Sequence, residues 1–154
     1  MFNSKKSGTT NLWIVPVEGG EPKALTFDKE AMGFACWSPD SKYIAFEMTR
    51  GDDNHLAIIP SSGGEPLQLT FAEGQSWPNS FSPDGDKIAF AGYRDGTWNV
   101  WWFSRSTKEE KQVTQYNNLN MFVRYTSWSP LGNQIVYEYA ETTGNIWMIE
   151  LKAE

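Results

Sequence analysis

The sequence has little cysteine, little histidine and no long apolar run. Among its 154 residues, Cys36 is the only cysteine and His55 is the only histidine. A single cysteine excludes an intrachain disulfide and a cysteine-rich zinc site, and a single histidine leaves one candidate base for a hydrolytic triad. No stretch approaches the run of about eighteen apolar residues that a membrane-spanning helix needs, so we expect no membrane span.

Positive charge is also scarce. The chain has 13 Lys and Arg against 19 Asp and Glu, which gives a formal net charge of −6 at pH 7. Its sequence pI is about 4.8. Binding to nucleic acid depends mostly on a surface of Lys and Arg that neutralises phosphates. We therefore expect no nucleic-acid partner.

The motifs of common catalytic and metal sites are missing as well. The sequence contains no G-x-S-x-G elbow, no Walker loop and no H-E-x-x-H pair. Calcium takes about six to eight oxygen ligands, usually from a D-x-D-x-D-G type of spacing. Neither Asp52-Asp53 nor Asp84 with Asp86 follows that spacing. We expect no catalytic residues and no bound metal or cofactor.

Aromatic residues, in contrast, are abundant. They make up 15% of the chain, with eight Trp, and they suit half-buried sheet surfaces better than helices. An aromatic residue opens each of three related phrases, WSPD at 37–40, FSPDG at 81–85 and WSPLG at 128–132. Ser-Pro-Asp-Gly favours a type I turn. Because an apolar run follows each turn, the phrases indicate a repeating all-β unit.

The chain repeats itself with a period of about 44 residues. Residues 11–53 align with 55–97 without a gap, and 17 of the 43 aligned pairs are identical. A third, looser copy starts at Asn99 and has two or three extra residues before Trp128. Such a period is typical of propellers whose blades have four strands. We predict repeats within one domain at about 11–54, 55–98 and 99–144, with a partial repeat at 145–154.

Each period divides into four short apolar runs that turn signals separate. In the first complete unit these runs lie at 33–37, 43–48, 55–59 and 67–71. The third run is apolar in both alternating positions, so we expect a layer of side chains on each of its faces, as stacked blades provide. The same pattern predicts further strands near the two ends of the chain, at 11–15, 22–27, 122–128, 134–140 and 145–151.

The motifs of this repeating unit resemble a known sequence repeat. The sequence contains the run LTF, a variable loop, WSPDS or FSPDG, IAF, a short loop with Arg and a strand like NLWIV, and this order is similar to the TolB-like, or WD40-like PD40, β-propeller repeat. The resemblance covers essentially the whole chain. It implies a β-propeller segment of about three four-stranded blades, half of a six-bladed ring, and a periplasmic or secreted location if the chain is like TolB, although no signal peptide is visible. The repeat serves in scaffolds and in peptidase gating domains, so its function stays open.

Variation between the repeats points to one face of the molecule. The turns SPD and GGEP are nearly alike in each unit and are expected on one face. The loops of the opposite face differ, at 28–32, 49–54, 72–80, 93–98, 115–126 and 139–144. Loops on a rigid scaffold carry most binding residues, and aromatic and Arg side chains anchor interfaces. The candidate binding residues of this loop face are Arg50, Trp77, Tyr93, Arg94, Tyr116, Phe122, Arg124 and Tyr125.

Structural roles compete with binding for several of these residues. Arg50 and Arg94 hold the same place in two repeats and match the Arg usual in the resembled repeat, which favours a bridge between neighbouring blades. For the aromatic residues Trp77, Tyr93 and Tyr125, the sequence supports packing at the rim of a blade and a binding role equally.

The only histidine and the only cysteine of the chain also have structural interpretations. His55 aligns with Asn11, Asn99 and Asn145, at the start of the third strand of each unit, so we interpret it as a polar strand residue and not as a catalytic base. We interpret Cys36 as a small buried apolar side chain.

These observations predict a non-enzymatic binding or scaffold module that recognises a protein or peptide through the loop face. Two alternatives remain: the propeller part of a larger prolyl-oligopeptidase-type or tricorn-type peptidase, and an excised or engineered fragment that self-assembles. Three blades cannot close a ring, so we also expect a homo-oligomer, a dimer that closes a ring by strand exchange. Residues 11–15 and 145–151 both have the pattern of a third strand, which leaves open which one would be displaced.

Overall fold

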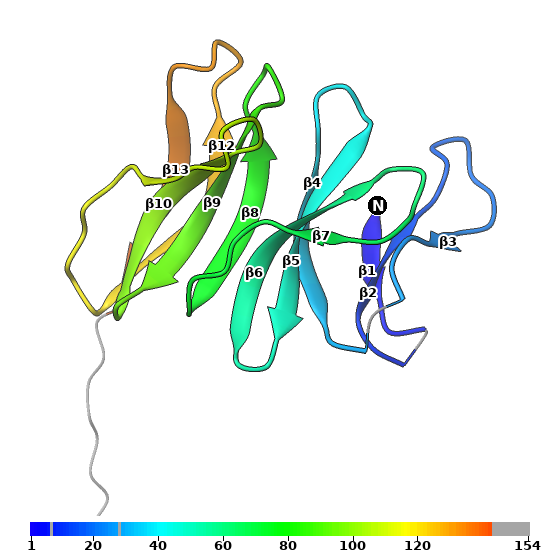
Figure 1. The fold of residues 1–154 in the computed structure, drawn as a ribbon, viewed down its shortest axis with the longest axis horizontal. Helices are drawn as coiled ribbons and strands as arrows, with labels where there is room; N and C mark the ends of the chain where they lie inside the picture. Colours follow the sequence, from blue (N-terminus) through cyan, green and yellow to red (C-terminus); the bar gives the residue numbers. More distant parts are fainter. Residues whose placement is uncertain (7, 28, 143–154) are drawn as a thin grey trace, which may run out of the picture.

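The protein is built as a row of β-sheets. The structure is a computed structural model that describes residues 1–6, 8–27 and 29–142, and these residues form thirteen strands and no helix. The sheets follow one another along the chain and fan out side by side, as the blades of a propeller do (Figure 1). The expected all-β propeller segment is confirmed.

Among the described residues, two complete blades lie between two partial ones. Blade I contains β1 (Phe2–Ser4), β2 (Asn11–Ile14) and β3 (Lys23–Ala24). Blade II contains β4 (Met32–Trp37), β5 (Tyr43–Arg50), β6 (Asp53–Pro60) and β7 (Leu67–Gln68). Blade III contains β8 (Gln75–Phe81), β9 (Lys87–Arg94), β10 (Thr97–Ser104) and β11 (Glu110–Gln112). Blade IV contains β12 (Met121–Trp128) and β13 (Ile135–Glu141).

The predicted four-strand unit is confirmed, with one change in its outermost strand. The runs predicted in the first complete unit correspond to β4, β5, β6 and β7. The last of them, predicted at 67–71, is shorter, because the amides of Leu69 and Thr70 both donate to the Leu56 carbonyl, at 2.7 and 3.3 Å, and the ladder with β6 ends there. The strand predicted at 145–151 lies outside the described residues.

Strand β1 was not expected from the sequence. It pairs with β2 in an antiparallel register that places Phe2 opposite Trp13. Phe46 and Phe90 hold the same place in the second strands of blades II and III, and the three phenylalanines are spaced by 44 residues. The repeat therefore starts upstream of residue 11, and β1 is the second strand of blade I. The spacing of these phenylalanines was the available signal.

The core consists of three layers, each lying between two neighbouring blades. Layer I/II buries Leu12, Leu25, Met32, Ile44, Phe46, Met48, Ala57 and Ile59. Layer II/III buries Ala45, Leu56, Ile58, Leu69, Phe81, Ile88, Phe90 and Phe103. Layer III/IV buries Ala91, Trp98, Val100, Met121 and Val123. Consecutive residues of the third strand β6, such as Leu56 and Ala57, enter different layers, so the expected layer on each face of this strand is confirmed.

The Ser-Pro-Asp phrase forms the predicted turn between the first and second strands of a blade. The Ser41 amide donates to the Ser38 carbonyl at 2.9 Å, as a type I turn requires. The Ser38 hydroxyl donates to Asp40 Oδ1 at 2.6 Å, and the Tyr43 amide donates to that hydroxyl at 2.9 Å. The hydrogen bond from Ser38 lowers the pKa of the Asp40 carboxyl. The β4–β5, β8–β9 and β12–β13 turns all lie at the upper end of the blades in Figure 1.

The last residue of this turn has a left-handed backbone in all three copies. Its φ angle is 58° at Ser41, 73° at Gly85 and 72° at Gly132. Glycine adopts this conformation without the clash that a Cβ atom causes, so Ser41 carries strain that its two counterparts do not.

We expect Ser41→Gly to raise the free energy of unfolding by about 0.5–1 kcal/mol, because the strain exceeds the extra chain entropy of glycine. Urea unfolding monitored by tryptophan fluorescence measures the change. The reciprocal control is Gly85→Ser, whose new Cβ would make only an ordinary 3.6 Å contact with Pro39. It should destabilise by a similar amount, and a destabilising Ser41→Gly would contradict the prediction.

Candidate functional site

The loop face is the end of the blades opposite the Ser-Pro-Asp turns. The β1–β2 and β5–β6 connections lie there, at the lower end of Figure 1. Of the eight candidate residues, Arg50, Tyr93 and Arg94 end the second strands β5 and β9, and Tyr116 lies in the connection between β11 and β12.

The other four candidates lie in strands. The predicted loop 72–80 is wrong in its second half, which belongs to β8. Residues 122–126 were assigned both to the loop 115–126 and to the strand 122–128, and β12 confirms the strand. Trp77 lies in β8, and Phe122, Arg124 and Tyr125 lie in β12. Both are the first strand of their blade. Pro78 made 72–80 look like a loop, but β8 accommodates it beside a register shift between Pro78 and Ser80.

A row of aromatic side chains connects blades II, III and IV. The ring of Trp77 lies 5.4 Å from that of Phe34 and 4.2 Å from that of Trp98. Trp98 in turn lies 5.3 Å from Tyr93 and 6.2 Å from Phe122. We call these five residues the aromatic row. Phe34 and Trp98 were not singled out in the sequence, because only the contacts between blades bring them to the other three.

Some side chains of the aromatic row are buried in the core, and others are exposed at the surface. Trp98 is 7% exposed and belongs to layer III/IV, and Trp77 packs against the same layer. Phe34 and Phe122 are 37% and 39% exposed, and the neighbouring Tyr125 is 57% exposed. The packing interpretation therefore accounts for Trp77, whereas the free aromatic surface comes from Phe34, Phe122 and Tyr125.

Arg94 and Arg50 hold the connections between blades. The Arg94 guanidinium donates to the Gln75 carbonyl at 2.7 Å and to the Ser76 hydroxyl at 2.6 Å, where the chain enters blade III. Arg50 lies 3.4 Å from a carboxylate oxygen of Glu30, just before the chain enters blade II. Each arginine thus fixes the segment that leads into its own blade, which supports a structural role for both.

Arg124 and Tyr116 have partners in blades III and IV. Arg124 Nη2 lies 2.7 Å from Glu138 Oε1 across the β12–β13 pair, and both side chains are partly exposed. The Tyr116 hydroxyl is 2.6 Å from that of Tyr137, and the Tyr116 amide donates to Asn99 Oδ1 at 2.7 Å. Tyr116 therefore mainly fixes the connection between these blades.

The loop face also has an acidic hollow of about 600 Å³ between blades II and III. The residues that line this acidic hollow are Asp53, Ala72, Glu73, Gly74, Tyr93, Arg94 and Asp95. Its lining contains three carboxylates and one guanidinium, that of Arg94. The Arg94 guanidinium already donates hydrogen bonds to Gln75 and Ser76 at the start of β8. The hollow suits a positively charged group.

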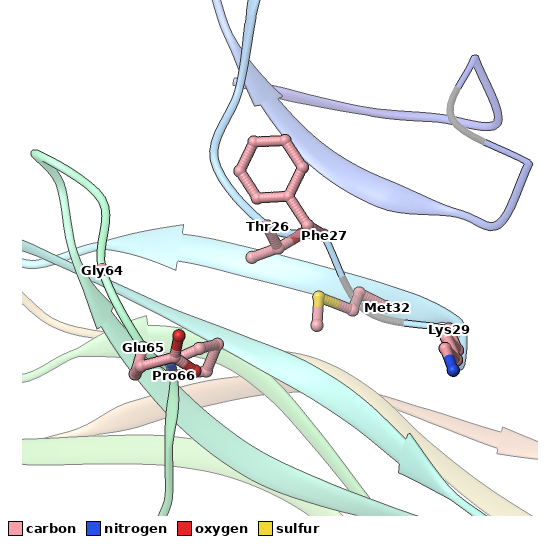
Figure 2. A pocket seen from close by; sticks show the side chains of 7 residues that line it. All are labelled: Thr26, Phe27, Lys29, Met32, Gly64, Glu65 and Pro66. Atoms are coloured by element: carbon pink, nitrogen blue, oxygen red, sulfur yellow. The ribbon is translucent and has the colours of Figure 1, made fainter.

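A second cavity, of about 300 Å³, lies between blade I and the turn that follows β6. Figure 2 shows its lining residues, Thr26, Phe27, Lys29, Met32, Gly64, Glu65 and Pro66. None of the eight candidate residues lines it. Lys29 and Glu65 lie on different sides of Met32 in this view, so the cavity brings no acid and base together (Figure 2).

The described part of the chain holds neither a metal-binding cluster nor a membrane-spanning helix. Within residues 1–6, 8–27 and 29–142, no three His, Cys, Asp or Glu side chains are grouped so that they could hold a metal ion. The same part of the chain contains no helix that could cross a membrane.

His55 lies in β6, at the place that Asn11 and Asn99 hold in β2 and β10. In those two strands the Asn side-chain oxygen accepts a 2.9 Å hydrogen bond from the hydroxyl of Thr26 or Thr114. His55 is only 6% exposed, and its Nδ1 has no hydrogen-bond partner among the described residues. Among the described residues, His55 Nδ1 therefore has no hydrogen-bonded carboxylate or hydroxyl beside it.

Cys36 is half-buried and packs against layer II/III. Burial raises the pKa of its thiol to about 12, so the thiol stays protonated at neutral pH and is a poor nucleophile.

Comparison with known proteins identifies the fold. No protein-family model and no curated protein matches the chain. Among solved structures, a putative TolB from Agrobacterium tumefaciens matches with a TM-score of 0.80 and 23% identity, over 90% of this chain and 49% of that one. TolB from Acinetobacter baumannii matches with a TM-score of 0.70 and 23% identity, over 83% of this chain and 31% of that one.

A peptidase structure also shares the fold. A structure from a study of two prolyl endopeptidases matches with a TM-score of 0.64 and 18% identity, over 86% of this chain and 23% of that one. The chain thus spans about half the length of the first TolB structure and less of the others. At these identities the comparisons show a TolB-like β-propeller fold, as the sequence resemblance implied.

The unpartnered His55 leads to a prediction about stability and pH. His55→Asn should restore the acceptor for Thr70 that the equivalent threonines have, and raise the free energy of unfolding by about 1 kcal/mol at pH 7. Burial lowers the pKa of His55, with a smaller opposing effect of the Asp53 charge. The unfolded state therefore takes up a proton near pH 6.5 that the folded state resists, and the native protein loses stability as the pH falls below that value.

Urea unfolding of both proteins at several pH values from 5 to 8 tests this prediction. The difference between the two curves isolates His55, because every other titrating group is shared. The stability gained by His55→Asn should grow as the pH falls below about 6.5. A difference that stays constant or shrinks on acidification would show that His55 is not held in the neutral form.

Proposed function

We propose that this chain is a non-enzymatic binding or scaffold module that recognises a protein or peptide through its loop face. The observation that carries the proposal is the free aromatic surface of Phe34, Phe122 and Tyr125. These side chains project from first strands that the interblade layers hold in place. Exposed aromatic side chains on a rigid support are common anchors of interfaces, because little conformational entropy is lost when they bind.

Tyr125→Ala tests the proposal once a partner has been found by affinity capture and purified. Tyr125 is 57% exposed and already has a φ angle of 52°, so alanine inherits the same backbone strain and little packing is lost. We expect the affinity to fall at least about tenfold, as for a central interface aromatic. Calorimetry with the purified partner measures the change.

The matched control is Leu131→Ala. Leu131 is an 85% exposed apolar residue in the Ser-Pro-Leu-Gly turn of the opposite face. The Leu131→Ala variant should bind the partner with the affinity of the native protein. Equal losses from both variants, or a loss only from Leu131→Ala, would remove the loop face as the binding surface.

The likeness to a prolyl endopeptidase structure supports a second candidate, in which the chain is the propeller part of a larger peptidase. Catalytic residues would then lie in another part of that protein. A longer reading frame with a hydrolase elbow would favour this candidate. A fragment that was excised or engineered to self-assemble is the third.

Self-association is part of the proposal, because both ends of the row of blades are open. Val136 on blade IV is 69% exposed, whereas Ala45 and Ala89, which hold the same place in blades II and III, are 0% exposed. On blade I, Phe2 is 40% exposed, whereas its counterpart Phe46 is 0% exposed. Apolar sheet faces of this kind are covered in soluble proteins, and a second copy offers complementary blades.

Strand exchange within such a dimer would need one strand to move. Blade I has the second, third and fourth strands of a blade, and blade IV has the first and second among the described residues. Joining them into one blade would bring two second strands, β1 and β13, to the same position. Either one of them leaves its sheet, or the two partial blades stack without merging.

We expect multi-angle light scattering after gel filtration to give a mass near 35 kDa, twice the 17.5 kDa of the chain. Val136→Glu should shift the mass toward 17.5 kDa, because it places a charge on the open face of blade IV. Val17→Glu is the control, since Val17 is 99% exposed and lies in the β2–β3 loop. A folded native protein of 17.5 kDa at micromolar concentration would contradict the dimer.

A further inference from the structure

Glu47 is a buried carboxylate close to the aromatic row. It lies in β5 and is 9% exposed. Among the residues that the structure describes, no lysine or arginine forms an ion pair with it. A carboxylate held in this way lacks the positive partner that usually accompanies a buried charge.

The repeat shows where such a partner would lie. In blade IV the equivalent residue is Glu138, which stands opposite Arg124 in the β12–β13 register. The two side chains form an ion pair of 2.7 Å. In blade II the place of Arg124 is taken by Gly33, at the register shift between Met32 and Ala35. Blade II therefore has the carboxylate of this pair and lacks its guanidinium.

The carboxylate of Glu47 fills the space that the missing side chain leaves. A Cβ atom on Gly33 would collide with Glu47 Oε2, so Glu47 bends over the glycine backbone. Burial raises the pKa of the Glu47 carboxyl, and the nearby Phe34 backbone and Trp77 side chain oppose that rise. The raised pKa reflects a desolvated anion with no neighbouring cation to offset its cost.

Aromatic rings border the same place. Phe34 and Trp77 lie 5.4 Å apart, and Phe34 is 37% exposed, so one side of the pair meets solvent. A planar guanidinium binds well where an aromatic face and a carboxylate occur together, because it stacks on the ring while it pairs with the anion. The acidic hollow on the same face would favour the approach of a positively charged partner.

We infer that Glu47, with Phe34 and Trp77, receives an arginine side chain of the partner. The inference rests on the proposed function and names the chemical group that the loop face recognises. The incoming guanidinium takes the role in blade II that Arg124 has in blade IV. The Phe34 ring supplies an exposed aromatic face, and the uncompensated carboxylate supplies the attraction.

The experiment uses N-acetyl-arginine methylamide as the probe and the indole N–H signal of Trp77 in a ¹⁵N-resolved NMR spectrum as the reporter. Trp77→Phe assigns that signal. N-acetyl-citrulline methylamide is the control ligand, because it has nearly the same shape and no charge. We expect a saturable shift of the Trp77 signal with the arginine probe and none with the citrulline probe.

Glu47→Gln should weaken binding of the arginine probe at least tenfold. Glu65→Gln removes the same charge from the opposite face and should leave the binding constant within twofold. The signals of the other indoles show whether each variant keeps the native fold. If Glu47→Gln does not fold, the comparison of the two probes on the native protein still decides the question.

A native protein that responds equally to both probes, or to neither, overturns the inference. So does Glu47→Gln with unchanged affinity for arginine. The proposed function has a separate test: if Tyr125→Ala weakens the partner while the arginine probe does not bind, the loop face remains the binding surface and only the arginine site is lost.

Discussion

The need to cover both faces of every central strand determines the rest of this structure. In β5, Ala45 and Phe46 are neighbours in sequence, both are 0% exposed, and they enter different interblade layers. A single sheet with two apolar faces cannot stay in water, so each blade needs another on either side. The chain answers this by repeating one blade, and each layer of the core is shared by two repeats.

The same stacking creates the loop face. Because neighbouring blades pack closely, the first strands β4, β8 and β12 bring Phe34, Trp77 and Phe122 into one row that no single blade contains. Trp98 lies between the rings of blades III and IV and is itself part of the core. Arg94 holds the entry into blade III. Surface and support are therefore built from the same repeat, because exposed and buried aromatic residues lie side by side.

The repeats differ at one place where the first strand of a blade faces the second. This place in the first strand is Gly33 in blade II, Trp77 in blade III and Arg124 in blade IV. The residues of the second strand that lie opposite are Glu47, Ala91 and Glu138. A purely structural repeat would gain from the same solution each time. Here the three blades present a buried carboxylate, an aromatic ring and an ion pair, which gives the loop face three chemically different patches on one scaffold.

The sequence by itself determined the repeat, the type I turns and the presence of layers on both faces of the third strands, because these follow from local backbone preferences and from the spacing of apolar residues. It misplaced Trp77 in a loop, it assigned residues 122–126 both to a loop and to a strand, and it did not find Glu47. Only the tertiary structure decided these points. The first strands of blades II, III and IV each contain a register shift, which breaks the alternation that sequence reasoning relies on, and the decisive contacts join residues of different blades.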